Sequence, residues 1–357
     1  MEVWTTGLSL PRVAARMAAR AEQAGFDGMV VVDSQNLAGD CYVALAMAAR
    51  ETEHLQLATG VTNPFTRHPA VTASAIASLQ VESDGRAVLG IGRGDSALAH
   101  LGHAPARVAH LERYLAAVQA YLRGEEIAFE ELAPFDPPGA APPVDTLELD
   151  ATAGASRLHW LRPDLPKVPV DVSATGPKVI DAAARLADRV TLAVGADPDR
   201  LRWAIERVRA QTHAVDEFGI GAFVNVVCHP DVEVARALAI GGMSTFARFN
   251  VMHGATEGPL FDGGSATLSR LHDAYDMRQH TRADSPQAAT LDDGFVDRFG
   301  IVGPPDACVE RLLALRDLGV ERVVIVGPSL GADRDAAIEA STLFATEVVP
   351  ELRRTTA

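Results

Sequence analysis

The amino-acid sequence predicts a closed (β/α)8 barrel, and three features lead to that prediction. Short runs of aliphatic and β-branched residues alternate with amphipathic stretches of helical spacing along the 357 residues. Eight such runs occur, which favours a barrel over an open, doubly wound sheet. Several of the runs are apolar throughout, as parallel strands covered on both faces are. No linker rich in Pro, Ser or Gly divides the series, so we expect one domain spanning residues 1–357.

The expected strands and helices follow one another in a regular order. Each strand is a short apolar run that stops at a glycine or a polar residue, and most helices begin near a capping residue or a proline. The first helix, for example, is expected to be capped by Ser9, with Pro11 in its first turn. We expect strands at residues 2–6, 28–33, 55–60, 87–91, 168–174, 189–194, 221–228 and 321–327. We expect helices at residues 9–24, 42–50, 69–81, 110–123, 177–187, 198–212, 232–249, 304–318 and 335–352.

Two segments interrupt this order. Between Gly124 and Lys167, closely spaced prolines lie among acidic and small residues, and this composition predicts an excursion from the barrel. A loop of this length is a lid, a partner-binding segment or disordered chain. Residues Asn250 to Arg298 are rich in Gly, His and Asp and show no clear strand. We therefore expect a second, irregular excursion there.

Composition excludes several classes of function. The formal net charge of −15 argues against a general affinity for nucleic acid or for an anionic membrane. The cysteines Cys41, Cys228 and Cys308 are far apart and in no metal-binding pattern, so we expect buried free thiols. The 11 histidines show no recognised metal spacing, and we expect no metal site. With no secretory signal and no apolar run of about 20 residues, a cytoplasmic protein acting on a small molecule is expected.

The stretch from Leu55 to Asp95 is where we expect the ligand to bind. It reads as strand, helix and strand, and each strand ends in polar or glycine-rich residues. Parallel α/β proteins bind ligands at the carboxyl ends of their strands. Asp33 and Asp95 follow the second and fourth strands, where a carboxylate accepts a ligand hydrogen bond, transfers a proton or caps the next helix. For Arg67 and Arg93 three kinds of partner are open: these two acids, an anionic ligand or groups at the protein surface.

Two further motifs have a binding and a purely structural interpretation. The run from Gly90 to Gly94 is spaced GxGxG, which is weak support for a dinucleotide site and equally consistent with a tight turn. In Ser173–Lys178, Thr175 offers a hydroxyl, Gly176 an open backbone N–H and Lys178 a charge at a helix start. These groups suit a phosphate. The alternative is an ordinary helix start capped by Thr175.

With these motifs placed, the chain resembles the bacterial luciferase-like family. It is most similar to the deazaflavin-dependent branch that includes methylenetetrahydromethanopterin reductase. The similarity runs in order from Met1 to about Glu351 and covers the two excursions poorly. The matching stretches are Val32–Ser34, Thr59–Pro64, Arg67–Ser74, Gly85–Asp95 and Ser173–Lys178.

The resemblance implies a coenzyme and a set of residues that hold it. The coenzyme would be F420, an 8-hydroxy-5-deazaflavin, with FMN as the alternative. In such proteins a non-prolyl cis peptide after the third strand supports the ring from behind, which here would be Gly60–Val61. Asp95 and Asp33 are the catalytic candidates, and Asp95 corresponds to an acidic residue near the reacting face in sugar-phosphate dehydrogenases. The residues assigned to the coenzyme are Asp33, Ser34, Gly60, Val61, Thr62, Asn63, Gly92, Arg93, Gly94, Ala174, Thr175, Gly176, Pro177 and Lys178.

One departure from the family pattern shapes the expected reaction. Related dehydrogenases place a basic histidine directly after the strand-two aspartate, where this chain has Ser34. We therefore expect a reductase that transfers a hydride from the coenzyme to a polarised C=C, C=N or C=O bond, with Asp95 or bound water as the acid. The alternatives are an FMN-dependent monooxygenase and a non-catalytic flavin-binding barrel. Because related barrels usually pair, a homodimer is expected.

Overall fold

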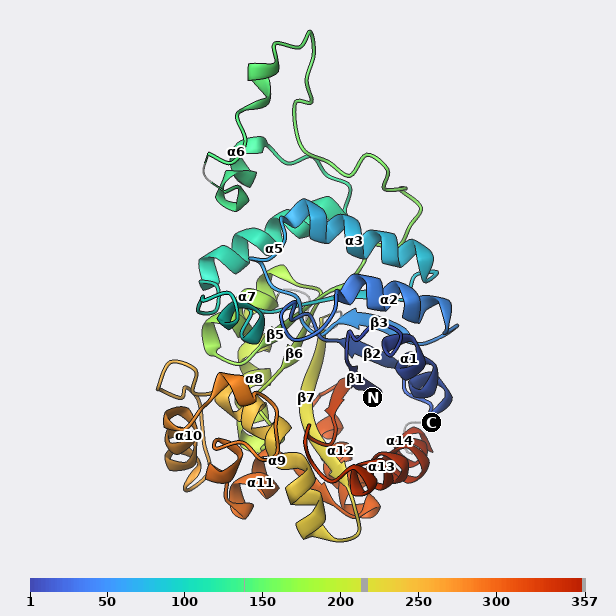
Figure 1. The fold of residues 1–357 in the computed structure, drawn as a ribbon, viewed down its shortest axis with the longest axis vertical. Helices are drawn as coiled ribbons and strands as arrows, with labels where there is room; N and C mark the ends of the chain where they lie inside the picture. The colour runs from blue at the N-terminus through green and yellow to red at the C-terminus, as the bar shows by residue number, and fades with distance from the viewer. Residues whose placement is uncertain (138, 213–217, 355–357) are drawn as a thin grey trace.

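The strands form a closed parallel barrel in the computed structural model, which describes residues 1–137, 139–212 and 218–354 (Figure 1). Eight strands pair side by side, and β7 closes the ring by pairing with β6 on one side and β9 on the other. The predicted barrel is therefore confirmed. Its strands are β1 (Glu2–Gly7), β2 (Gly28–Val31), β3 (Gln56–Thr59), β4 (Ala87–Ile91), β5 (Val170–Ala174), β6 (Arg189–Leu192), β7 (Gly219–Cys228) and β9 (Arg322–Val326).

The described residues contain one strand that the sequence pattern does not reveal. This strand, β8 (Ile301–Gly303), pairs with the last residues of β7, with Ile301 opposite Val226. A run of three residues is too short to show a period. Strand β7 accommodates it because ten residues are enough to pair with β6 and β9 along the first part and with β8 at the end.

Helices cover the outside of the barrel (Figure 1). Each of the nine expected helices has a counterpart, and the last one is divided into α13 and α14 by a π-helical turn at Phe344–Val348. A short helix, α4 (Ser96–Ala99), was not predicted. The others are α1 (Ala14–Gln23), α2 (Cys41–Arg50), α3 (Pro69–Glu82), α5 (Val108–Leu122), α7 (Pro177–Leu186), α8 (Pro198–Gln211), α9 (Val232–Phe249), α12 (Pro305–Asp317), α13 (Arg334–Leu343) and α14 (Val349–Arg354).

The first helix begins later than predicted. Arg12 has a positive φ of 63°, which interrupts a helix, and α1 starts only at Ala14. Ser9 does not cap it. Its hydroxyl donates a hydrogen bond of 2.8 Å to the carbonyl oxygen of Val32 instead. Ser9 thus ties the loop after β1 to the segment that carries Asp33.

The first excursion leaves the barrel, as predicted. Figure 1 shows the segment projecting beyond α3 and α5 at the top of the molecule. Its described residues contain one helical turn, α6 (Phe129–Leu132), two short 3₁₀ turns and an isolated antiparallel bridge between Ile127 and Ser156. The prolines between 134 and 143 explain why no longer element forms in the described part of this segment.

The second excursion is not irregular, so that prediction was wrong. It contains helices α10 (Gly264–Asp273) and α11 (Asp293–Phe299). Their apolar residues pack with α9 into a hydrophobic cluster separate from the main core. The side chain of Asp292 caps α11 by accepting a hydrogen bond of 2.9 Å from the backbone N–H of Phe295. The many Gly, His and Asp residues between these short helices conceal their period in the sequence.

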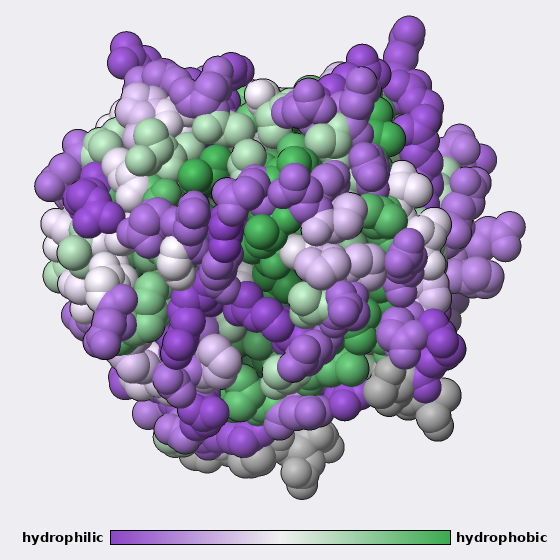
Figure 2. All heavy atoms as spheres, turned by 90° about the horizontal axis from the view of Figure 1, so that it is seen from below, coloured by the Kyte–Doolittle hydropathy of each residue, from purple (hydrophilic) through white to green (hydrophobic). Residues whose placement is uncertain are grey.

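The molecular surface is largely polar where Figure 2 shows it. Hydrophilic side chains predominate on this face, and hydrophobic side chains are visible between them near its centre. Within the described ranges, no helix combines the length and the apolar character needed to cross a bilayer.

Candidate active site

The carboxyl ends of β3 and β4 form the floor of the barrel mouth. The peptide bond between Gly60 and Val61 is cis, as the family resemblance implies. The next residue, Thr62, donates its backbone N–H to Gly90 at 2.9 Å, and its carbonyl oxygen accepts the N–H of Gly92 at 2.9 Å. The backbone that follows the cis bond is therefore fixed against the end of β4.

The glycines of the GxGxG run allow this close approach. A Cβ on Gly90 would lie 2.0 Å from the carbonyl oxygen of Thr59, and one on Gly92 would lie 3.1 Å from Val61. Gly94 has φ +79°, and its Cβ would meet Leu98 at 2.9 Å. These contacts support the turn interpretation, because each glycine has a packing reason within the chain itself.

Two buried polar atoms beside the floor have no partner among the described residues. They are Oγ1 of Thr62 and Nδ2 of Asn63. Asn63 is oriented through its other side-chain atom, Oδ1, which accepts the N–H groups of Phe65 and Thr66 at 3.0 Å each. Because buried polar groups are almost always hydrogen-bonded, unpaired ones at a barrel mouth point to a ligand. A hydroxyl can donate or accept and an amide nitrogen donates, so a ligand with hydrogen-bond acceptors suits both atoms.

Asp33 lies just past β2 and is held by Arg67. The guanidinium contacts the Asp33 carboxylate at 2.6 and 3.4 Å, and it also bonds Asp40 at 2.9 Å. Asp33 does not cap α2, since Asp40 does so. The neighbouring Ser34 lies with its hydroxyl 2.9 Å from that of Ser96. Asp33 is thus an anchored carboxylate in the wall of the mouth, and its catalytic role stays a prediction.

Asp95 is paired with a residue that the sequence does not suggest. It precedes α4 without capping it, and its Oδ1 lies 2.6 Å from Nη1 of Arg248 at the end of α9. Its other oxygen, Oδ2, is buried without a hydrogen-bond partner. Arg93 turns away from both acids and donates to the carbonyl oxygens of Ala106 at 2.5 Å and Pro105 at 3.3 Å.

The segment after β5 leads into a helix start with no side-chain cap. Ala174 ends the strand, Gly176 is the N-cap residue, and Pro177 occupies the first turn of α7. The Thr175 hydroxyl does not cap the helix; it donates a long, 3.5 Å hydrogen bond to the carbonyl of Ala193. Pro177 has no N–H, and the N–H groups of Val179 and Ile180 both donate to the carbonyl oxygen of Gly176 at 3.1 Å. Within the first turn of α7, the N–H of Lys178 therefore remains to bind an anion.

Lys178 stands in the first turn of this helix with an exposed side chain. It is one of only two lysines in the chain, whereas arginine is abundant. A lysine at this position can bind a phosphate as a point charge. One carboxylate oxygen, from exposed Glu257, comes within 3.9 Å of where a Cβ on Gly176 would stand.

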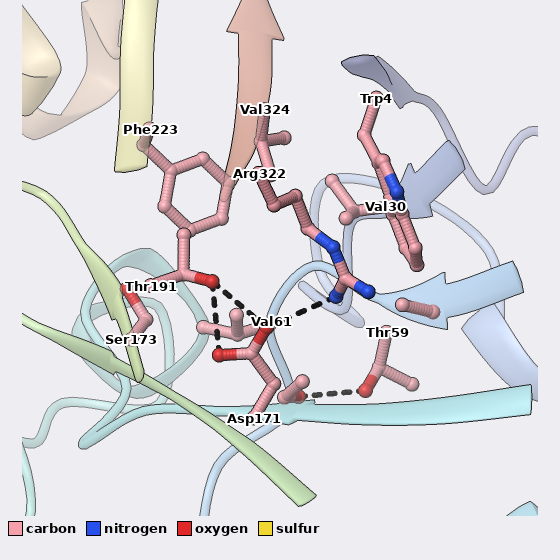
Figure 3. A pocket seen from close by; sticks show the side chains of 12 residues that line it. Trp4, Val30, Thr59, Val61, Asp171, Ser173, Thr191, Phe223, Arg322 and Val324 are labelled. Atoms are coloured by element: carbon pink, nitrogen blue, oxygen red, sulfur yellow. Dashed lines mark hydrogen bonds and ion pairs between the residues drawn. The ribbon is translucent and has the colours of Figure 1, made fainter. Parts of the chain in front are cut away.

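A network of charged residues fills the barrel below the mouth (Figure 3). Arg322 lies 2.6 Å from Glu2 and 3.5 Å from Asp171, and its guanidinium stacks on Trp4 at 3.8 Å from the ring centre. Thr191 donates to both oxygens of Asp171. Burial raises the pKa of Asp171. A cavity lies in the barrel between this network and Val61.

Sequence reasoning missed the contribution of α9 to the mouth. Phe246 and Phe249 pack against the cluster of side chains inside the barrel that Val61 also contacts. Arg248 lies between them in the chain and reaches Asp95. No local motif marks these residues. The one available signal is Asn225, the only polar side chain in the apolar run of β7, whose Nδ2 is buried and unpaired.

The cysteines and the possible metal-binding side chains form no further site among the described residues. All three cysteines are buried and carry no disulfide. Within residues 1–137, 139–212 and 218–354, no three side chains of His, Cys, Asp or Glu converge to hold a metal ion.

A closed parallel barrel with unpartnered polar atoms at its mouth defines the class of (β/α)8 barrel proteins, whose ligands bind at the carboxyl ends of the strands. The chain belongs to the luciferase-like monooxygenase family, whose model matches residues 4–322. The expected family is thereby confirmed, and the protein is a luciferase-like oxidoreductase.

Individual relatives agree with this assignment along nearly the whole chain. The 5,10-methylenetetrahydromethanopterin reductase of Methanolobus tindarius is 27% identical over 340 residues, covering 91% of this chain and 93% of that protein. The F420-dependent glucose-6-phosphate dehydrogenase of Beutenbergia cavernae is 27% identical over 356 residues, covering 93% and 91%. The structure of the coenzyme F420-dependent tetrahydromethanopterin reductase from Methanopyrus kandleri superposes with a TM-score of 0.70 at 22% identity, covering 98% and 99%.

Proposed function

We propose that this protein transfers a hydride between coenzyme F420 and a polarised C=C, C=N or C=O bond of a small molecule, with reduction as the working direction. One observation carries the proposal. Thr62, Asn63 and Asp95 each present a buried, unpaired polar atom at the same end of the barrel, beside a backbone floor. The relatives named as F420-dependent support the choice of coenzyme.

The residues of the chain fit such a coenzyme in distinct ways. Thr62 and Asn63 bind the polar edge of the ring, and Val61 lies behind it. Lys178 holds a phosphate through its ammonium group and its backbone N–H at the start of α7. Phe246 and Phe249 on α9 keep water out of the barrel mouth. The exclusion of water strengthens the polar contacts inside the mouth. The coenzyme itself supplies or accepts the hydride, while the protein binds and orients the reactants.

An FMN-dependent monooxygenase is the second candidate, and one observation favours it. The arginines at the mouth, Arg67, Arg93 and Arg248, are all engaged by groups of the chain itself. Lys178 then remains to bind an anionic ligand. One cation suits the single phosphate of FMN better than the acidic tail of F420.

Titrating the purified protein with each coenzyme separates these functions. We expect saturable binding of F420, followed by fluorescence quenching, and reoxidation of the reduced coenzyme by at least one member of a panel of enones, imines and ketones. Binding of FMN without binding of F420 would overturn the proposal. Coenzyme binding without reoxidation by any acceptor would support the non-catalytic barrel.

The Lys178→Ala variant is expected to weaken coenzyme binding by about tenfold or more. A hydrogen bond to a charged group contributes about 1.5–3 kcal/mol, and this substitution removes the charge at the proposed phosphate site. The matched control is Lys167→Ala, which removes the other lysine, a residue that pairs with Asp188 at 2.6 Å away from the mouth. Equal affinities of the two variants in fluorescence titration would remove Lys178 from the site.

We also propose that two copies of the chain pair through α2 and α3, which pack side by side on the outside of the barrel (Figure 1). Residues 41–49 and 69–81 contain no Asp, Glu, Lys or Arg. Val43, Met47 and Val71 are more than half exposed there. Because each copy carries a net charge of −15, self-association is least opposed at a surface without acidic residues.

The double variant Met47→Arg/Val71→Arg is expected to convert a dimer into a monomer. It would bring two positive charges from each copy into the apolar contact, where like charges are costly. Molar mass from light scattering during gel filtration measures the change. The control is Ile338→Arg, which alters an equally exposed residue on α13. A wild-type protein of monomer mass, or a double variant that remains dimeric, would refute this interface.

A further inference from the structure

A chain of polar side chains from three separate segments forms a wall of the barrel mouth. Asp95 follows β4, Arg248 lies in the last turn of α9, and Tyr275 and His280 follow α10 in the second excursion. Arg248 lies 2.6 Å from Asp95, and its guanidinium stands over the ring of Tyr275 at 4.6 Å from the ring centre. The hydroxyl of Tyr275 lies 2.8 Å from Nδ1 of His280.

The position of α9 brings these polar side chains close to the proposed coenzyme site. Phe246 and Phe249, in the same turn as Arg248, contact the side chains inside the barrel around Val61. Two polar atoms at this wall, Oδ2 of Asp95 and Nε2 of His100, are buried without partners among the described residues. The mouth therefore combines a tyrosine–histidine pair with open hydrogen-bonding capacity.

The surroundings of the pair determine its charge state. Burial lowers the pKa of His280 below its ordinary 6.5, Asp95 acts in the opposite direction, and Arg248 and His100 lower it further. Burial raises the pKa of Tyr275 to about 12. At neutral pH the imidazole is therefore uncharged and the phenol protonated, so that Tyr275 donates its hydrogen bond to Nδ1 of His280.

We propose that Tyr275 transfers the proton that accompanies the hydride, and that His280 exchanges this proton with solvent. Arg248 is a positioning residue that holds the Tyr275 ring beside Asp95. This assignment rests on the proposed function. It supplies the proton-transfer group that a histidine in place of Ser34 would otherwise provide.

The proton step balances in both directions. When a hydride from the reduced deazaflavin or flavin adds to the carbon of a C=N or C=O bond, the π electron pair moves to the heteroatom. That atom takes a proton from the Tyr275 hydroxyl, the Tyr275 oxygen takes one from Nδ1 of protonated His280, and His280 regains one from water. The coenzyme is oxidised and the substrate reduced. Oxidation of an alcohol or amine reverses every transfer and begins with neutral His280.

The direction of the pH dependence follows from this scheme. Reduction needs protonated His280, so its rate should rise as the pH falls below 6.5. Oxidation needs neutral His280, so its rate should rise with pH and be level above 6.5. A His280→Gln variant should lose this dependence in both directions. Tyr275→Phe should lower kcat by about 10²–10⁴-fold, the usual contribution of general acid–base catalysis, with coenzyme affinity unchanged.

An NMR titration of the histidine side chains tests the pair without any coenzyme. The signal missing from His280→Gln identifies His280, which should titrate below 6.5 in the wild type. Tyr275→Phe removes a hydrogen bond to neutral Nδ1 and should raise that midpoint. The matched control is Tyr121→Phe, which removes a phenol hydroxyl that lies 2.6 Å from the Ser156 hydroxyl. This pair belongs to the first excursion and its neighbouring helix, so the control should leave the titration midpoint of His280 unchanged.

The outcomes separate this inference from the proposed function. A His280 midpoint that Tyr275→Phe does not move would overturn the pair, whatever the coenzyme does. Tyr275→Phe with wild-type kcat at every pH would do the same in a protein that binds and oxidises F420. If the wild type binds no coenzyme, the proposed function fails and the proton-transfer role falls with it, even where the titration shows the pair intact.

Discussion

Replacing Gly90 with alanine is expected to lower the free energy of unfolding by about 3 kcal/mol or more, the upper part of the range for overpacked positions. The added Cβ would lie 2.0 Å from the carbonyl oxygen of Thr59, a backbone atom that cannot rotate away. Strands β3 and β4 would have to separate directly beneath the Gly60–Val61 bond. Loss of coenzyme binding should therefore accompany the loss of stability, and urea unfolding with a parallel titration measures both.

A matched substitution separates this clash from a general effect of removing glycine. A Cβ on Gly154 would meet nothing within 4 Å, and the backbone there has no positive φ that requires glycine. Gly154→Ala should leave stability within about 0.5 kcal/mol of the wild type, as surface substitutions usually do. A Gly90→Ala protein with an unchanged urea midpoint would show that the two strands are not as closely packed as described.

The Arg322→Met variant is expected to lose about 3–5 kcal/mol of stability, the usual cost of breaking a buried ion pair. The substitution leaves Asp171 buried without its cation and removes the partner of Glu2. Replacing both members, as Asp171→Asn with Arg322→Met, should recover much of the loss because the buried carboxylate is then gone, while the more exposed Glu2 keeps its hydrogen bond from Trp4. The surface control is Arg353→Met, which breaks an exposed pair with Asp27 and should cost about 1 kcal/mol or less.

The loss caused by Arg322→Met should grow with pH. The pKa of Asp171 is already raised by burial, and Arg322 opposes that shift. Removing the arginine raises it further. A carboxyl whose pKa is raised on folding favours the folded state at low pH, and this contribution disappears as the pH rises through the folded pKa. The difference in unfolding free energy between variant and wild type should therefore be larger at pH 8 than at pH 5. Equal differences would contradict the assignment.

The repeating part of the fold was predictable from local pattern. Continuous apolar runs such as residues 28–31 and 87–91 mark strands buried on both faces, and eight alternations of strand and helix favour a closed barrel. The sequence did not reveal β8, because three residues carry no period, or α10 and α11, because their apolar residues face a small cluster of their own. The start of α1 was misplaced because the positive φ of Arg12 has no signature in the sequence.

The candidate site likewise contains residues that the sequence predicts and partners that it does not. Residues that follow a strand directly, such as Asp33, Thr62 and Asp95, were predictable because parallel strands bring their carboxyl ends together. The partners of these residues were not. Arg248 reaches Asp95 from 153 positions away, and the network of Asp171 and Arg322 joins strands 151 positions apart. Only the three-dimensional closure of the barrel decides such pairings.

The separate hydrophobic cluster beneath the second excursion has an evolutionary consequence. Residues 250–298 pack mainly on α9, in a cluster that also includes Val227 of β7 and is separate from the cluster around Val61. Divergence there can replace Tyr275 and its neighbours without disturbing the floor at Val61. Chains descended from a common ancestor are therefore expected to keep one way of holding the coenzyme while acquiring different substrate ranges.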